Sequence, residues 1–294
     1  MGKSELGTRF IIGPILLLIT AGLYYSDTHG TQGYASAAVL ALLSVAAVAE
    51  FTGMFRQAGF PVAAGLLMLV TLALHASAFF FGWTAIDREL YPPVIGTMAL
   101  LFPLALRGLA PRRMGKGLEE MGGTLLGFIL LAWPMYLAQG IALRHVESLF
   151  FVVLVCKFGD IGGYLFGMAF GRHKLIPHIS PGKTIQGSVG SLLASCGMAV
   201  WLSPILLFQE VEKVTGNADP IVGGLDVTLL GAILIGIMLN CTAQIGDLVE
   251  SLLKRRCKVK DSSRMLPAHG GVLDLTDSLL FSFPAYLLIL TIQT

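Results

Sequence analysis

The sequence has few charged residues for its length. Asp, Glu, Lys and Arg make up 13% of its 294 residues, against about 25% in a typical soluble domain. Apolar residues make up 55%, and the mean hydropathy is +0.77. Because one globular core cannot bury this much apolar surface, a soluble protein is excluded and a membrane protein with several spans is indicated.

Three further absences exclude other classes of protein. The 20 Lys and Arg residues barely outnumber the 18 Asp and Glu residues, so the basic excess of a nucleic-acid-binding protein is missing. The four cysteines show no C-x-x-C spacing, which predicts neither a disulfide framework nor a zinc site. The segment Gly182-Lys183-Thr184 is not a P-loop, because Pro177 stands where that motif needs its first glycine.

Apolar runs occupy most of the chain. A helix needs about 20 mainly apolar residues to cross the hydrocarbon layer of a membrane. No small-x-small cleavage pattern closes the first apolar run, so we expect it to remain as a helix. We predict an all-α protein, a polytopic transmembrane helix bundle of about nine spans: 10–25, 34–51, 60–83, 91–110, 121–143, 147–170, 188–208, 225–249 and 272–292.

Positive charges alternate between successive loops. One set of loops carries 16 of the 20 Lys and Arg residues, and loops of that kind lie in the cytosol. This alternation predicts a cytosolic N-terminus and a C-terminus outside. Because the unusual polar residues gather in the second half, we predict a transmembrane scaffold over 1–146 and a catalytic region over 147–294, with cytosolic loops at 171–187 and 250–271.

Two charges lie near the middle of the sixth predicted span, Lys157 and Asp160. A charge at that depth costs about 2.5–3.5 kcal/mol on the insertion scale, so each needs a partner or a wet cavity. At three residues apart on one helix, they can pair with each other. They either fix helix packing as an ion pair or line a polar cavity, and we favour the cavity.

The loop before the seventh span holds a weaker candidate for a phosphate site. Ser180, Lys183 and Thr184 precede the apolar run 188–208. A lysine beside the free N–H groups at a helix start suits a phosphate. A plain positive loop on the cytosolic side would have the same composition.

The strongest signal lies between residues 246 and 281. Two acidic pairs at i,i+3 spacing, Asp247 with Glu250 and Asp274 with Asp277, lie at the cytosolic ends of the last two predicted spans. If these helices lie side by side, the carboxylates meet at one depth. They then repel each other unless a cation lies between them, and oxygen ligands of this kind select Mg²⁺ or a similar ion.

The connection between these two spans suits phosphate groups. It contains His269-Gly270-Gly271, whose backbone amides precede a helix. It also contains five cations that can bind phosphate oxygens: Lys254, Arg255, Arg256, Lys258 and Lys260. Carboxylates for a divalent ion, with cations and amides for phosphates, predict phosphoryl or nucleotidyl transfer.

A long motif of mixed residue types runs through this region and the segments before it. Its parts are Asp160 with Tyr164, Ser180-Pro181-x-Lys183-Thr184-x-Gln186-Gly187, Gly246-Asp247, Ser251-x-Leu253-Lys254-Arg255, Lys260-Asp261, Pro267-x-His269-Gly270-Gly271-Val272-x-Asp274 and Asp277. The motif resembles the signature of the phosphatidate cytidylyltransferases, also called CDP-diglyceride synthetases. The resemblance covers about 155 to 281, and the first five spans match only in being apolar.

The resemblance implies that CTP and phosphatidate react to CDP-diacylglycerol and pyrophosphate in the bacterial cytoplasmic (inner) membrane, at an active site that faces the cytosol. It implies Mg²⁺, joined by a monovalent ion such as K⁺, with Asp247 and Asp274 as metal ligands and with Lys254 and Asp277 as further catalytic residues. The substrate-binding residues that we predict, from the resemblance and, for Lys157, from its charge in the sixth span, are Lys157, Asp160, Ser180, Lys183, Thr184, Arg255, Lys260, Asp261, His269, Gly270 and Gly271. The implied partners are the two substrates and membrane lipids, without nucleic acid, and a homodimer is left open.

Two positions depart from the family pattern. Leu275 stands where the family usually has Arg, and Ile161 stands where it usually has Ser or Thr. The acids of the motif are intact, which argues against an inactive relative.

Two other functions remain open at this point. A CTP-dependent lipid-alcohol kinase would need the same metal and cations, but it would yield CDP and a lipid monophosphate. An ion-coupled transporter would use Lys157, Asp160 and Asp247 as a relay. The transporter hypothesis predicts acids spread through both halves of the chain, whereas here they gather at one face of one half.

Overall fold

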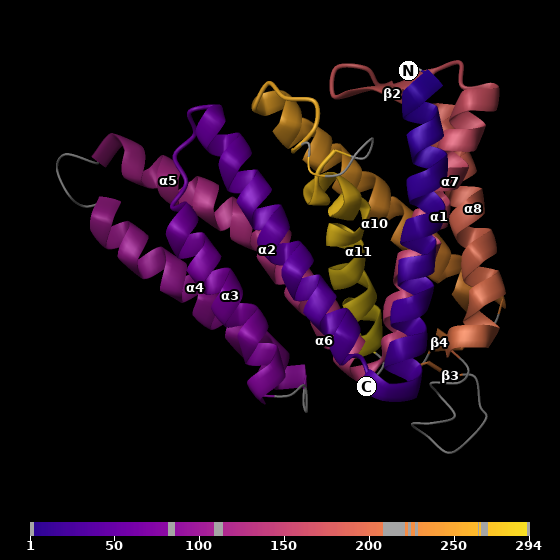
Figure 1. The fold of residues 1–294 in the computed structure, drawn as a ribbon, viewed down its shortest axis with the longest axis horizontal. Coiled ribbons are helices and arrows are strands. Elements are labelled where there is room, and N and C mark those ends of the chain that lie inside the picture. The colour runs from indigo at the N-terminus through magenta and orange to yellow at the C-terminus, as the bar shows by residue number, and fades with distance from the viewer. Residues whose placement is uncertain are drawn as a thin grey trace. The chain divides into compact units, whose positions relative to one another are not determined.

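The computed structural model describes residues 3–81, 86–108, 114–207, 221–222, 225–226, 229–263, 265 and 270–292. Regular structure in these residues is almost entirely helical (Figure 1). The α-helices are α1 (Lys3–Ser26), α2 (Tyr34–Gln57), α3 (Ala64–Phe81), α4 (Ile86–Gly108), α5 (Met114–Gly127), α6 (Trp133–Arg144), α7 (Val146–Phe170), α8 (Ile185–Leu202), α10 (Leu229–Arg256) and α11 (Val272–Ile292).

Shorter elements connect or extend these helices. Three π-helical turns are η1 (Asp27–Thr31), η2 (Phe128–Ala132) and η3 (Ser203–Leu207). Two antiparallel hairpins pair β1 (Lys174–Ile176) with β2 (Ser180–Thr184), and β3 (Ile221–Val222) with β4 (Leu225–Asp226).

Six described helical stretches are long and apolar enough to cross a membrane, as in a multi-pass membrane protein. They are Tyr34–Gln57, Lys116–Arg144, Val146–Phe170, Ile185–Leu207, Leu229–Arg256 and Val272–Ile289. Helices α3 and α4 contain shorter apolar stretches, Ala64–Phe80 and Pro92–Gly108. The predicted helical membrane bundle is confirmed at this level, while the count of nine spans and the sides of the two termini stay predictions.

The chain forms two compact units. The N-terminal unit comprises Met1–Arg144 together with Lys254–Thr276, and the C-terminal unit comprises His145–Leu253 together with Asp277–Thr294. The segment after α10 therefore packs with the N-terminal helices, although it follows them by more than 100 residues. Within the N-terminal unit, α2 contacts α3 and α6, and α4 contacts α5.

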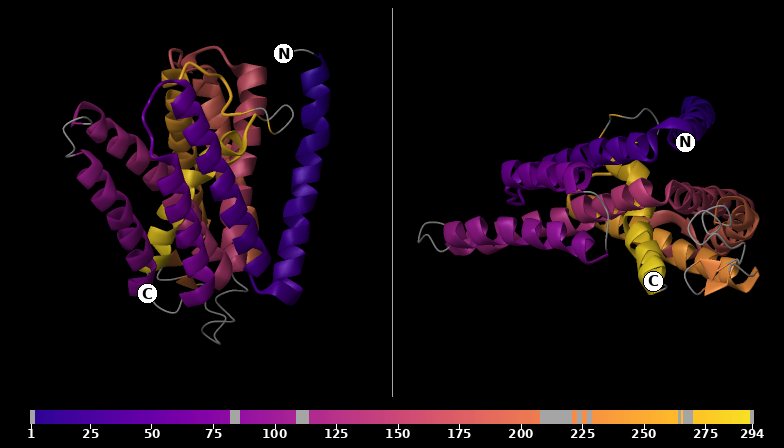
Figure 2. Two further views of the ribbon diagram at one scale, coloured as in Figure 1. Left: turned by 60° about the vertical axis from the view of Figure 1, so that its left-hand side comes forward. Right: turned by 90° about the horizontal axis from the view of Figure 1, so that it is seen from below.

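In the C-terminal unit, α7 and α8 run side by side (Figures 1 and 2). Buried polar side chains tie the other helices to this pair. The Asn240 amide of α10 donates to Ser191 Oγ at 2.6 Å and to Ser195 Oγ at 3.0 Å on α8. Ser148 of α7 and Tyr286 of α11 share a hydrogen bond of 3.0 Å. Such polar contacts hold membrane helices in register, because apolar side chains gain little by leaving lipid for one another.

The β1–β2 hairpin was not predicted from the sequence, which placed residues 171–187 in a loop. Lys174 pairs with Thr184 and Ile176 pairs with Ser180. The Thr184 hydroxyl then accepts a hydrogen bond from the Gly187 N–H at 3.1 Å and caps the start of α8. The hairpin thus ends directly at the helix, which fixes Lys183 one residue before the cap.

Candidate active site

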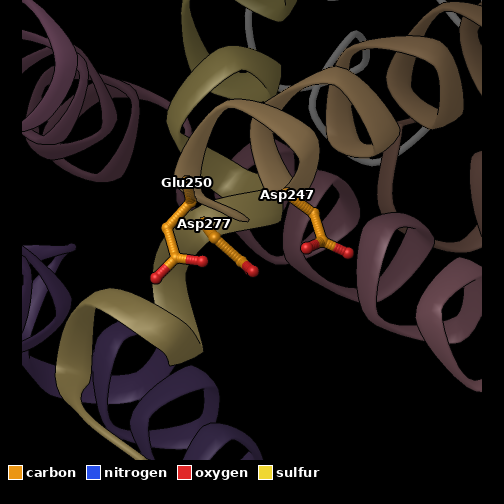
Figure 3. A group of neighbouring side chains, drawn as sticks. All are labelled: Asp247, Glu250 and Asp277. Atoms are coloured by element: carbon orange, nitrogen blue, oxygen red, sulfur yellow. The ribbon is translucent and has the colours of Figure 1, made fainter. Parts of the chain in front are cut away.

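Three carboxylates come together on α10 and α11 in the C-terminal unit (Figure 3). Asp247 and Glu250 lie one turn apart on α10, and Asp277 lies on α11. Their ligand oxygens all lie within 4.8 Å of one another. Glu250 is 2% exposed, so this part of the cluster is shielded from water. The sequence predicted that four acids meet here, and the structure brings three of them together.

A glycine allows the two helices to approach each other at this cluster. A Cβ atom added to Gly246 would collide with the backbone carbonyl oxygen of Asp277. Any larger residue would therefore push α10 away from α11. The position directly before Asp247 thus needs glycine for packing, and the separation of the acids depends on it.

The β1–β2 hairpin adds a cation beside the acids. Lys183 Nζ lies 2.6 Å from Asp247 Oδ2, with both side chains partly exposed. Ser251 Oγ donates to Asp247 Oδ1 at 3.4 Å. Two predicted site residues from different segments, Lys183 and Asp247, are therefore in direct contact.

A second polar group connects the cluster to α7. Lys157 Nζ lies 3.3 Å from Asp160 Oδ2, as the i,i+3 spacing predicts, and donates to Ser278 Oγ at 2.9 Å. Ser278 Oγ donates to Asp160 Oδ2 at 3.0 Å, and its backbone N–H donates to Asp277 Oδ1 at 2.6 Å. A chain of polar contacts thus runs from Asp277 into the middle of α7.

Asp274 belongs to the N-terminal unit, where four hydrogen bonds hold its carboxylate. Lys254 Nζ lies 2.5 Å from Asp274 Oδ1, and the two side chains are only 13% and 10% exposed. Asp274 Oδ2 accepts from the Ser262 N–H at 2.8 Å, from Ser262 Oγ at 2.7 Å and from the Gly271 N–H at 2.8 Å. The pairing of Asp247 with Asp274 on one metal ion stays a prediction.

The remaining predicted residues have different surroundings. Gly271 uses its N–H on Asp274 rather than leaving it exposed, and Gly270 has a positive φ of 83°. Arg255 donates to the Val259 carbonyl at 3.3 Å. His269 lies outside the described residues. Among the others, Thr184 is buried, Ser180 is half-buried, and Arg255, Lys260 and Asp261 are exposed.

Glu50, which lies in α2, was not predicted from the sequence. Its carboxylate accepts hydrogen bonds from Ser262 and Ser263 and from the first two N–H groups of α11. The available signal was a single acid near the end of an otherwise apolar run, 34–51. An acid at such a position is costly unless it has partners.

A carboxylate cluster that can hold a divalent metal ion, with lysines beside it, is typical of enzymes that act on phosphate groups. The chain belongs to the cytidylyltransferase family, whose model matches residues 7–293. The resemblance that the motifs indicated is thereby confirmed.

Individual relatives carry a more specific name. The phosphatidate cytidylyltransferase of Bacillus subtilis is 32% identical over 225 residues, which cover 75% of this chain and 74% of that protein. Those of Staphylococcus epidermidis and Staphylococcus haemolyticus are 40% identical over 159 residues and 43% identical over 149 residues. These two matches cover 54% and 51% of this chain. They cover 53% and 50% of the two relatives, so the chain spans about half the length of these staphylococcal proteins.

Proposed function

We propose that this protein is a phosphatidate cytidylyltransferase, which makes CDP-diacylglycerol and pyrophosphate from CTP and phosphatidate. The observation that carries the proposal is the contact between Lys183 and the carboxylate cluster of Asp247, Glu250 and Asp277. It places a cation that can bind phosphate beside carboxylates that can hold a divalent metal ion, in a member of the cytidylyltransferase family. The substrate class follows from its relatives, the phosphatidate cytidylyltransferases of Staphylococcus epidermidis and Bacillus subtilis.

The donor set of the cluster fits Mg²⁺. All three side chains offer carboxylate oxygens, which are the ligands that Mg²⁺ prefers. Neighbouring oxygens around octahedral Mg²⁺ lie about 3–4 Å apart. The ligand oxygens of the three side chains lie within 4.8 Å of one another, so small side-chain movements would bring them to that spacing. When bound, Mg²⁺ would neutralise phosphate charge. Asp247, Glu250 and Asp277 would hold it, and a second, monovalent ion such as K⁺ belongs to the same proposal.

The reaction needs no nucleophile from the protein. A phosphate oxygen of phosphatidate forms a bond to the α-phosphorus of CTP, and the bond from that phosphorus to the pyrophosphate oxygen breaks. A phosphate monoester is largely doubly ionised at neutral pH, since its second pKa is about 6. The attacking oxygen is then already deprotonated, so the residues around it serve to position and stabilise charge.

In this proposal, the lysine side chains bind the phosphate groups of the substrates. Lys183, at the end of the hairpin, binds the triphosphate beside the acids, while Lys254 is oriented by Asp274 and stabilises the departing pyrophosphate. Lys157 and Asp160 form the polar group nearer the middle of α7, on the side of the lipid substrate. The cluster faces the cytosol of a bacterial inner membrane in this proposal, because CTP is cytosolic and the lipid head group lies at the leaflet boundary.

Pyrophosphate release separates this function from its rivals. Purified protein receives CTP and Mg²⁺ with phosphatidate, with a long-chain alcohol, or with no lipid. We expect pyrophosphate and CDP-diacylglycerol only with phosphatidate. A lipid monophosphate with CDP would identify a lipid-alcohol kinase, and the absence of any CTP turnover would refute both enzymes.

A further inference from the structure

Helix α2 carries a buried carboxylate outside every motif of the family resemblance. Glu50 is 8% exposed and lies in the last two turns of α2. Its Oε1 accepts from Ser263 Oγ at 2.7 Å and from the Val272 N–H at 2.9 Å. Its Oε2 accepts from Ser262 Oγ and from the Leu273 N–H, both at 2.9 Å. One side chain of the predicted scaffold thus binds the start of α11 and two serines of the connection between α10 and α11 (257–271), which we call the signature loop.

The Glu50 carboxylate is linked to Asp274 through one hydroxyl. Ser262 Oγ lies 2.9 Å from Glu50 Oε2 and 2.7 Å from Asp274 Oδ2. A hydroxyl has a single proton to donate, so the two carboxylates share it. Asp274 in turn holds Lys254 at 2.5 Å. The position of a predicted catalytic lysine therefore depends on an unbroken series of contacts that starts on α2.

The glycines of the signature loop leave room for Glu50. A Cβ atom added to Gly271 would collide with the Glu50 carboxylate and with Ser262 Oγ. Gly270 has a φ of +83°, a conformation that favours glycine. The Gly270-Gly271 pair of the motif is thus explained by the approach of Glu50 and by the turn into α11.

A second buried acid, Asp27, also accepts hydrogen bonds from N–H groups at a helix start, but within the described residues it does not contact the family motif. Asp27 is 2% exposed, and it accepts from the N–H groups of Ala35 and Ser36 at the start of α2 and from Thr31 Oγ1. None of these donors belongs to the family motif. Asp27 and Glu50 are therefore comparable as helix caps. Asp27 caps the start of α2, and Glu50 lies about 24 Å further along that helix, at a rise of about 1.5 Å per residue from Tyr34.

We propose that Glu50 is a positioning residue for cytidylyl transfer. It holds Ser262, Ser263 and the start of α11, and through Ser262 it fixes Asp274 and the ammonium group of Lys254 against the phosphates. This inference rests on the proposed function. The negative charge of Glu50 also suits the start of α11, where backbone N–H groups carry partial positive charge.

The test compares Glu50→Gln with Glu50→Asp and with the matched control Asp27→Asn. Each protein is purified in detergent, and its thermal unfolding, its kcat, its KM for CTP and its amide hydrogen exchange over 260–263 and 270–274 are measured. We expect Glu50→Gln to lower kcat at least tenfold per folded molecule, to raise the KM for CTP, and to speed exchange in this loop. Glu50→Asp, which keeps the charge, should recover part of the kcat. Asp27→Asn should lower the unfolding temperature and leave kcat within twofold.

Two results would overturn the proposal. One is a Glu50→Gln protein that keeps kcat and the KM for CTP within twofold, whatever its unfolding temperature. The other is an Asp27→Asn protein that loses as much kcat as Glu50→Gln, since the effect would then be general destabilisation. If Glu50→Gln does not fold, Ser263→Ala removes one contact to Glu50, and we expect a several-fold loss of kcat. An inactive wild type refutes the proposed function instead, and loop exchange still shows whether Glu50 orders the loop.

Discussion

The ion pair between Lys254 and Asp274 can be removed from either side, and the two changes should not cost the same. The side chains are 13% and 10% exposed. Removing one partner of a buried pair costs about 3–5 kcal/mol, because the other charge stays buried. In Lys254→Met, Asp274 keeps its hydrogen bonds from Ser262 and Gly271, so we expect the lower end, about 3 kcal/mol.

The reverse change should be milder. Lys254 lies in the last turn of α10 and has a long flexible stem. In Asp274→Asn, its ammonium group can turn toward water, and we expect a loss of about 1–2 kcal/mol. The double variant should lose about 2 kcal/mol less than the sum of the single losses, since residues in contact are coupled. All three variants should lose pyrophosphate release, because the proposed reaction needs the Lys254 charge at the phosphates and Asp274 to orient it.

The assay is thermal or denaturant unfolding in one detergent, with pyrophosphate release measured on the same samples. Arg107→Met is the control, since Arg107 lies 3.8 Å from Glu120 and is half exposed. Exposed pairs contribute at most about 1 kcal/mol. Strictly additive losses for Lys254→Met and Asp274→Asn would refute the ion pair. Wild-type turnover in Asp274→Asn would refute its place in the site.

Three further predictions address the metal, the glycines and the hairpin. Glu250→Gln and Asp277→Asn should each raise the Mg²⁺ concentration for half-maximal rate about tenfold, and an unchanged Mg²⁺ titration would contradict the ligand set. Gly271→Ala should lower activity severalfold because its Cβ collides with Ser262 Oγ and the Glu50 carboxylate, whereas Gly182→Ala, with nothing within 4 Å, should be neutral in the same assay. Thr184→Ala should lower the free energy of unfolding by about 1 kcal/mol through loss of the α8 cap, and denaturant unfolding that matches wild type would contradict the capping role.

The helices could be predicted because a helix is one of the few structures that satisfies all backbone hydrogen bonds in lipid. A segment in hydrocarbon must satisfy its own N–H and C=O groups, so a long apolar run predicts a helix. The β1–β2 hairpin could not be predicted in this way. Its strands have only three and five residues, and β2 contains Pro181 and Gly182, which are rare inside strands. The hairpin depends on pairing between short segments rather than on composition.

The spacing of the acids on α10 could be predicted from the sequence, but the residue that anchors Asp274 in the N-terminal unit could not. Asp247 and Glu250 lie one turn apart, so any helix brings them to one face. Glu50 meets Ser262 across 212 residues of sequence, and no local pattern encodes a contact of that length. Its only trace is one acid in an apolar run, which indicates a partner without naming it.

The start of α11 has a consequence for how the products leave. Backbone N–H groups at a helix start hold a phosphate in one fixed geometry. Here the N–H groups of Gly271, Val272 and Leu273 already donate to the protein's own carboxylates. At this helix start, the phosphate groups of the proposed substrates would therefore meet side-chain ammonium groups on flexible stems instead of a rigid set of backbone N–H groups. Such charges can follow a departing anion and exchange it for water, so we expect pyrophosphate to dissociate quickly and to inhibit the enzyme only weakly.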